Sequence, residues 1–322
     1  MPLRPRRRQG YDLIGGGRVE CDRVSIMCQL KYCGTALAVV FIFSLTCVLQ
    51  AVGVLAGELE CVSFLSEEDA RGPSPTGCLE GYLHGRIVEG DCANVVYLIR
   101  TNPKVLRIFH LNSPGGDAAE AIKIGQLFRQ RLLETRAPMD WGTGQPELHA
   151  NGGSDVVCTG TECACAGACA LIWFGGIRRL GVVGLHGPRI EDQSFKAMAA
   201  ADASAAYRQI LGTISNYLAE MDAPQSIIDK MVATSSSEVR WVSANRDNLA
   251  EPPSITEWID ASCRPMSEDQ RAYSATPNEM PRSQRLFGDQ LALKDRLDKM
   301  REERIDCEEA LLSREVDKLP RP

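Results

Sequence analysis

Two adjacent glycines in one turn are the residues of this sequence best suited to chemistry. The turn, residues 112–117 (Asn-Ser-Pro-Gly-Gly-Asp), separates an apolar run at 105–111 from a helical pattern that begins at Ala118. This pattern indicates a buried strand, a tight turn and a helix start. Glycines adopt backbone angles closed to other residues, and N–H groups beside a helix N-terminus can bind a developing oxyanion. The turn therefore predicts an oxyanion site, although an ordinary strand-to-helix turn capped by Asp117 gives the same pattern.

A second stretch, residues 163–189, also combines a helix start with a reactive side chain. Small residues from Ala164 to Ala170 open a predicted helix that runs through Phe174 and ends at two glycines. Residues 182–185 then predict a strand that leads to His186. Small residues at a helix start let a ligand approach the backbone closely. His186 is either the base of a site or a histidine that ends a strand and bonds to the backbone.

The charge of the chain is divided unevenly along its length. The 322 residues carry a net charge of -6, but residues 1–56 hold seven basic and three acidic side chains. The remainder has 29 basic and 39 acidic residues, a net charge of −10. An acidic body behind a basic leader argues against nucleic acid as a partner.

The leader has the pattern of a membrane-crossing or signal helix. Residues 32–57 contain no charged side chain and would span about 39 Å as a helix, enough to cross a bilayer. Positive charges precede this run, so we expect the N-terminus in the cytoplasm and the body exported. The protein is then held at the inner membrane, or is periplasmic or secreted if the leader is cleaved after the small-residue pattern at 54–56. Met27 could be the start of an ordinary signal peptide.

Export changes how the cysteines are interpreted, because thiols outside the cytoplasm tend to pair. Nine cysteines follow the leader: Cys61, Cys78, Cys92, Cys158, Cys163, Cys165, Cys169, Cys263 and Cys307. Since nine is odd, we expect at least one to be free or bonded to another chain. The cluster at 158–169 could hold zinc, but its spacing differs from the usual separated C-x2-C pairs, so disulfides are favoured and neither metal nor cofactor is expected.

The remaining pattern places one main domain between two linkers. Residues 1–57 form the leader, 58–77 a linker, 78–263 the domain, 264–284 a second linker and 285–319 an amphipathic helix. Within the domain we expect a strand or hairpin at 79–88, helices at 91–101 and from 118 to about 134, a loop with at most one strand at 138–160, a helical hairpin at 193–220 and 224–232, and a strand at 239–242.

Taken together, the two turns resemble the Clp-protease and crotonase superfamily. The Asn-Ser-Pro-Gly-Gly turn before a helix, the Cys/Ala-rich turn into a helix ending Gly-Gly, and the strand ending in His occur in that order. Within the superfamily the sequence is most similar to exported, Clp-peptidase-like proteins, over about residues 78–262. The resemblance implies an α/β fold, a spiral of ββα repeats with active sites where helices begin. It also implies a serine nucleophile at a helix start, a histidine base and an acid that orients the histidine.

Carried over to this sequence, the resemblance implies an oxyanion hole made by Gly115, Gly116 and the N–H of Ala168, with His186 as the base. The nucleophile, however, is missing. In such peptidases the nucleophile lies nine residues before the second of the two glycines that end the helix. That glycine is Gly176 here, so the nucleophile's position falls on Gly167. The resemblance thus implies an altered or inactive serine peptidase, a pseudoenzyme.

One alternative would restore a nucleophile. If the turn is slipped by two residues, Cys165 takes the serine's position, and a thiolate near His186 and a helix N-terminus would be activated. The acid has two candidates, Glu238 and Asp247, of which neither matches a motif. Each of these can equally be a solvated surface charge.

The C-terminal segment, residues 285–319, carries Leu and Met at steps of three, four or seven. This spacing is typical of a short coiled coil or a partner-binding helix, or of an amphipathic helix folded on its own domain. If these Leu and Met side chains pack against a second copy of the chain, Cys307 could form the intermolecular disulfide that the odd number of cysteines requires.

Three functions are open on the sequence alone. The protein is a membrane-tethered homo-oligomer that binds peptide or protein segments in an altered Clp-type cleft, a hydrolase that uses Cys165 and His186, or a crotonase-like acyl-thioester enzyme, which needs an oxyanion hole but no nucleophile. The third is disfavoured, because export separates the protein from its coenzyme A pool.

Overall fold

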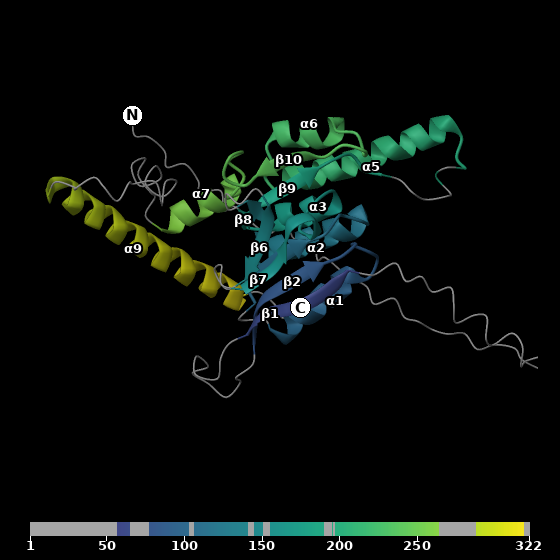
Figure 1. Ribbon diagram of the computed structural model, residues 1–322. Coiled ribbons are helices and arrows are strands. Elements are labelled where there is room, and N and C mark those ends of the chain that lie inside the picture. Colours follow the sequence, from purple (N-terminus) through teal and green to yellow (C-terminus); the bar gives the residue numbers. More distant parts are fainter. Residues whose placement is uncertain are drawn as a thin grey trace, which may run out of the picture.

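The structure, a computed structural model, describes residues 57–64, 77–102, 106–140, 145–150, 155–189, 195, 197–263 and 288–318. Within these residues the chain is an α/β protein with seven α-helices and three β-sheets (Figure 1). The α/β class predicted from the sequence is therefore confirmed. Residues 1–56 of the predicted leader (1–57) and all of the second linker (264–284) lie outside the described residues. No helix among the described residues is long and apolar enough to cross a membrane.

The largest sheet has five strands in the order β1-β2-β3-β4-β8. Its strands are β1 (Glu58–Phe64), β2 (Cys78–His84), β3 (Ile108–Asn112), β4 (Glu134–Arg136) and β8 (Arg178–Leu180). β2, β3, β4 and β8 run parallel, while β1 pairs antiparallel with β2. Because the parallel strands share one direction, their carboxyl ends meet at one edge, where the turn after β3 lies.

The first linker prediction is wrong for residues 58–64. These residues form β1, which pairs with β2 along its length and is held to it by the disulfide Cys61–Cys78. The domain therefore includes a strand that charged residues in the sequence obscured. An edge strand can carry glutamates on its open face without loss of pairing.

Two smaller sheets complete the fold. β9 (Val182–Leu185) pairs antiparallel with β10 (Arg240–Ser243), as expected for two strands at these positions. A three-stranded sheet consists of β5 (Met139–Asp140), β6 (Pro146–Ala150) and β7 (Asp155–Thr159), followed by the short 3₁₀ helix η2 (Gly160–Glu162). The prediction of a loop with at most one strand at 138–160 is therefore wrong, because short strands separated by glycines carry little periodic signal.

Two helices begin where sequence capping signals place them. α1 (Asp91–Thr101) has its predicted bounds, and α2 (Ala118–Gln130) begins after Asp117, whose side chain accepts a hydrogen bond from Glu120 N (2.9 Å). Glu120 in turn accepts hydrogen bonds from Gly90 N (3.0 Å) and Cys92 N (2.8 Å), so one carboxylate binds the start of α1 from the first turn of α2. α2 ends four residues earlier than predicted, since Leu132 takes a positive φ of 54° and the chain turns into β4.

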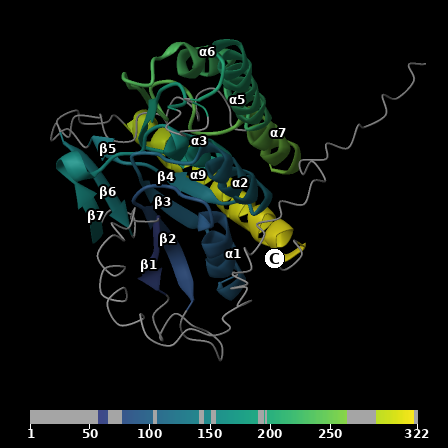
Figure 2. The ribbon, with the colours of Figure 1, turned by 90° about the vertical axis from the view of Figure 1, so that its right-hand side faces the viewer.

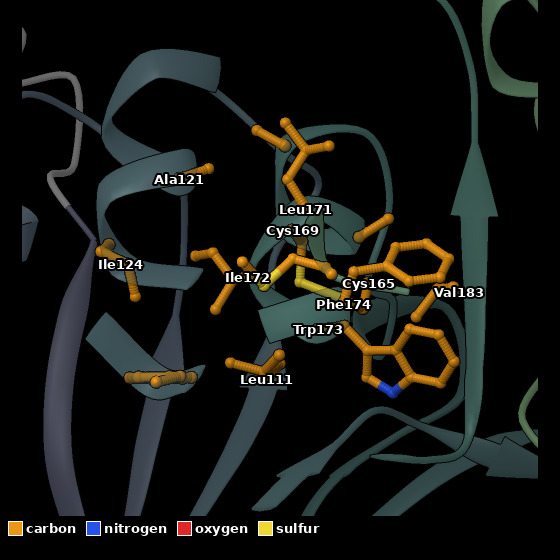
Figure 3. Close-up of a cluster of buried hydrophobic side chains, with 14 of the residues drawn as sticks. Leu111, Ala121, Ile124, Cys165, Cys169, Leu171, Ile172, Trp173, Phe174 and Val183 are labelled. Atoms are coloured by element: carbon orange, nitrogen blue, oxygen red, sulfur yellow. A yellow bond between two sulfur atoms is a disulfide. The ribbon is translucent and has the colours of Figure 1, made fainter. Parts of the chain in front are cut away.

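The core is organised around close contact between α2 and α3 (Ala168–Gly175). All eight residues of α3 are buried, and Figure 3 shows Ile172 toward Ile124 of α2 and Leu111 of β3, with Trp173 and Phe174 beside Val183 of β9. The contact depends on glycine: a Cβ on Gly175 would lie 2.2 Å from the carbonyl oxygen of Gly125. A Cβ on Gly125 would lie 1.8 Å from Tyr217 Oη, which donates a 2.7 Å hydrogen bond to Leu171 O.

The carboxyl end of α3 is held by a buried cation. Arg179 is 1% exposed and donates hydrogen bonds to the carbonyl oxygens of Phe174 (2.6 Å), Gly176 (3.2 Å) and Met221 (2.5 Å). Its guanidinium lies over the rings of Trp173 and Phe174. Burial lowers the pKa of Arg179 to about 9, while the carbonyl oxygens at the helix end favour its charged form.

α5 (Ala200–Glu220) and α6 (Gln225–Ala233), which follow β9, lie together at one end of the molecule, and α9 (Gly288–Lys318) runs along another side (Figures 1 and 2). α5 and α6 form the expected hairpin, with α5 beginning later than predicted, and α7 (Pro253–Ser262) follows β10. α9 folds back on its own domain. Its Arg304 forms an ion pair with Asp260 (2.7 Å), and its Leu311 is buried against α7.

The disulfides predicted from export are confirmed, whereas the prediction for the odd cysteine is wrong. Four pairs lie among the described residues: Cys61–Cys78, Cys158–Cys163, Cys165–Cys169 and Cys263–Cys307. Cys92 is disulfide-bonded as well, so none of the nine cysteines is a free thiol. Cys307 joins α9 to the end of α7 and is not available for a bond between chains.

The close contact of α2 and α3 leads to a first prediction. The substitution Gly125→Ala should lower the free energy of unfolding by about 1–3 kcal/mol, because its Cβ overlaps Tyr217 Oη in a packed core. Gly212→Ala, also within a helix but with no atom within 4 Å of the added Cβ, should instead raise it by roughly 0.5–1 kcal/mol. Urea unfolding followed by circular dichroism measures both, and equal effects would contradict the packing described here.

Candidate functional site

A hollow of about 370 Å³ lies where the turn after β3, the start of α3 and the end of β9 meet. α5 and α6 close it with apolar side chains, and two arginines lie among its lining residues. The lining residues used below are Arg86, Gly116, Asp117, Gly167, Ala168, His186, Arg189, Ile210 and Met231. Most of the residues predicted from the two turns therefore line one hollow. Gly115 and Cys165 are not among its lining residues.

One of the two glycines of the first turn lines the hollow. Gly115 is buried at φ 104° and its N–H donates to Ser113 Oγ (3.1 Å), while its carbonyl accepts from Ile87 N (3.0 Å). Gly116, at φ 146°, is exposed and lines the hollow, and its N–H donates to no group among the described residues. The expectation that Gly115 supplies an oxyanion N–H is therefore wrong, because Ser113 Oγ already takes that hydrogen.

The second turn is clamped between β3 and β9 by backbone hydrogen bonds. Ser113 N donates to Ala164 O (2.7 Å), Ala166 N to Ser113 O (3.0 Å) and Gly167 N to Gly184 O (2.9 Å). Ala168 is the first residue of α3, so its N–H has no partner within the helix, and none is found elsewhere in the described part of the chain. Gly116 and Ala168 thus both line the hollow with backbone N–H groups that have no partner among the described residues, and their binding of an oxyanion stays a prediction.

Gly167, directly before α3, lies at a sharp turn. Its φ of 57° and ψ of -116° are strained for any residue with a side chain. A Cβ built on Gly167 would lie 2.5 Å from His186 Nε2. The residue that the family's spacing selects is therefore the one that faces the histidine, and it carries no side chain.

Among the described residues, the backbone orients His186, and no acid contacts its ring. Its Nδ1 lies 2.8 Å from Gly187 O, and because a carbonyl oxygen only accepts, Nδ1 must carry the proton. In the neutral ring Nε2 then holds a lone pair that faces Gly167. The Gly187 N–H donates to Thr234 O (2.8 Å), which fixes the carbonyl that orients the ring.

Cys165, the alternative nucleophile, is not in the hollow. It is 0% exposed and bonded to Cys169, 1% exposed, beneath the start of α3 (Figure 3). A sulfur atom in a disulfide has no thiolate to attack a carbonyl. The prediction of a cysteine nucleophile is contradicted in this oxidised form.

Neither acid candidate contacts His186. Asp247 accepts a hydrogen bond from Ser243 N (2.8 Å) after β10 and faces Lys230 (3.9 Å) and Arg246 (3.8 Å). Glu238 is exposed in the turn before β10. The role of acid proposed for these residues is therefore wrong, because the structure assigns the orientation of His186 to a carbonyl oxygen.

Charge at the hollow comes from residues that no motif marked. Arg86, after β2, and Arg189, after His186, are both exposed. They line the same hollow as Gly116 and Ala168. Asp117 is the one carboxylate among the lining residues named above, and its side chain already caps α2. Among the described residues, the only group of three potential metal ligands lies elsewhere, on β1 and β2.

Comparison with known proteins adds no family to this geometry. A scan against protein-family models found none that matches the chain, and a search of curated proteins found no similar sequence.

The juxtaposition of Gly167 and His186 leads to a second prediction. Gly167→Ala should lower the free energy of unfolding by about 1–3 kcal/mol, from its positive φ and from overlap with the imidazole. In a His186→Ala background the overlap disappears. Gly167→Ala should then lower the free energy of unfolding by roughly 0.5–3 kcal/mol less than it does in the wild type. Urea unfolding of the two single variants and the double variant gives this coupling energy, and a value of zero would place the two residues apart.

Proposed function

We propose that this chain is an exported, membrane-tethered protein of Clp-peptidase-like fold whose hollow binds a peptide segment of a partner without cutting it. The observation that carries the proposal is Gly167, which takes the strained geometry of a nucleophile, faces His186 Nε2, and has no side chain. The disulfide at Cys165 supports the same reading by removing the other candidate nucleophile.

The arrangement of elements supports the fold proposed here. β3 followed by α2, and the turn at Cys165 followed by α3, are two strand-turn-helix units whose helices begin at one hollow. The parallel strands of the main sheet end on the same side. Both features are expected of a spiral of ββα repeats with sites at helix starts. The export and membrane tether rest on the leader, and the disulfides are of the kind that persist outside the cytoplasm.

The chemistry left in the hollow suits binding. Two N–H groups, at Gly116 and Ala168, can hold a carbonyl oxygen, and the positive end of α3 favours its partial negative charge. His186 Nε2 can accept a hydrogen bond from a peptide N–H, since its lone pair faces the hollow. Apolar side chains from α5 and α6, including Ile210 and Met231, supply contact area for a partner's side chain. A homo-oligomer of such hollows would bind an extended segment more tightly by avidity.

The absence of covalent chemistry is tested with a fluorophosphonate probe. The wild type should not be labelled, because Gly167, the residue that faces His186 Nε2, carries no side chain. Gly167→Ser should become labelled once the imidazole rotates away from the added Cβ, and Gly167→Ser/His186→Ala should lose that labelling. Circular dichroism of each variant checks that it is folded. Labelling of the wild type that disappears in His186→Ala would contradict the proposal.

Binding is tested by fluorescence anisotropy with fluorescein-labelled casein as an unfolded polypeptide. Ile210→Asp places a charge at the apolar wall of the hollow and should weaken binding at least about tenfold, or about 1.4 kcal/mol. Gln209→Asp makes the same charge one residue earlier on α5, at an exposed position outside the hollow, and should leave binding unchanged. Equal affinities for Ile210→Asp and the wild type would place the binding surface elsewhere.

A further inference from the structure

Three side chains with metal-binding atoms converge at the edge of the main sheet, and none of them lines the hollow. Glu58 of β1 lies directly opposite His84 of β2 in the antiparallel register, and Glu60 lies two residues further along the same face. The two carboxylate groups and the imidazole place one oxygen or nitrogen atom each within 4.8 Å of one another. It is the only such group of three among the described residues.

The distances within this group do not fit hydrogen bonds. His84 Nε2 lies 3.6 Å from Glu58 Oε2 and 3.6 Å from Glu60 Oε1. Hydrogen bonds between nitrogen and oxygen are typically about 2.7–3.2 Å long. Although Nε2 is shielded from solvent, it has no hydrogen-bond partner among the described residues. The nitrogen is therefore equidistant from two carboxylates and bonded to neither.

The two other pairs of histidine and glutamate in the described chain behave differently. His110 Nε2 lies 2.7 Å from Glu80 Oε2, and His149 Nε2 lies 3.1 Å from Glu147 Oε2, both within hydrogen-bonding range. His84 has twice the number of carboxylates within reach and still makes no hydrogen bond to them. Its two 3.6 Å distances instead match the separation of ligand atoms around a tetrahedral zinc ion. Ligand atoms about 2.0–2.2 Å from such an ion lie roughly 3.3–3.6 Å from one another.

The imidazole is held in this orientation by its neighbours. The ring of Tyr82 stacks on that of His84, with 4.5 Å between centroids and 15° between planes. Asn112 donates a 2.9 Å hydrogen bond to Tyr82 Oη, and the disulfide Cys61–Cys78 fastens β1 to β2 beside the group. The glutamate side chains are 55% and 59% exposed, so an ion can enter from solvent and water can complete its coordination. Support of a ligating ring by surrounding groups is a feature of metal sites.

We propose that Glu58, Glu60 and His84 bind a divalent zinc-class cation, with water as the fourth ligand. Carboxylate oxygen and imidazole nitrogen are both zinc ligands, and three protein ligands with an open position form a known type of site. The ion fastens the edge strand β1 to β2 at the point where the chain enters the domain. The site is independent of the hollow and of the peptide binding proposed for it.

Isothermal titration of the full chain in detergent with Zn²⁺, after alkylation of free thiols, tests the site. The wild type should show one binding event that His84→Ala abolishes and that Glu58→Gln/Glu60→Gln weakens at least about tenfold. Both glutamates are exposed, so their replacement leaves the core intact. His149→Ala is the matched control, since it removes a histidine beside a single glutamate, and it should bind Zn²⁺ as the wild type does.

A second readout is thermal unfolding in the presence and absence of Zn²⁺. Binding to the folded state should raise Tm in the wild type and in His149→Ala, and should leave Tm unchanged in His84→Ala. Absence of Zn²⁺ binding by the wild type, or equal affinity in His84→Ala, would overturn the proposal and leave the group as an ion pair of one histidine with two carboxylates.

Discussion

The contact between α2 and α3 is the constraint on which the rest of the structure depends. At Gly125 and Gly175 the two helix backbones approach so closely that a single Cβ would meet the opposing carbonyl or the Tyr217 hydroxyl. Burial raises the pKa of Tyr217, which keeps its hydroxyl neutral and able to donate to Leu171 O. Because both helices are rigid, their crossing point fixes where their N-termini lie. Gly116 and Ala168 therefore line one hollow although 52 residues separate them in the sequence.

Helix starts that meet in this way create a positive field with little help from side chains. The partial charge at each N-terminus comes from unpaired N–H groups, and Asp117 compensates it at α2 by capping, while Glu120 caps the start of α1. No residue named at the start of α3 supplies a carboxylate cap, because its N-cap is Gly167. The uncompensated end of α3 is thus the stronger attractor for an oxygen atom with negative charge, and His186 lies beside it. A nucleophile is not needed for that attraction.

The sequence predicted those elements whose side chains repeat at a clear period or carry a cap. α1, the start of α2, α3 and β9 follow directly from such signals. The sequence did not predict β1 or the sheet of β5, β6 and β7. Short edge strands with charged residues and glycines resemble linkers. At the site, the positions of Gly116, Gly167 and His186 followed from motif order. What could not be read from the sequence was three-dimensional pairing: the Ser113 hydroxyl on Gly115, the carbonyl that orients His186 and the partners of the cysteines.

The disulfide beneath the site explains how the turn can keep its shape without a functional side chain. In an enzyme, a strained φ at a nucleophile is retained because catalysis requires it. Here Cys165 and Cys169 are bonded on either side of Gly167, so the turn is closed covalently and packed against Leu111 and Ile172. Glycine at position 167 lowers the strain further, because it alone tolerates this backbone angle freely. The geometry of this turn is therefore held by a covalent bond and by glycine, and it needs no functional side chain at position 167.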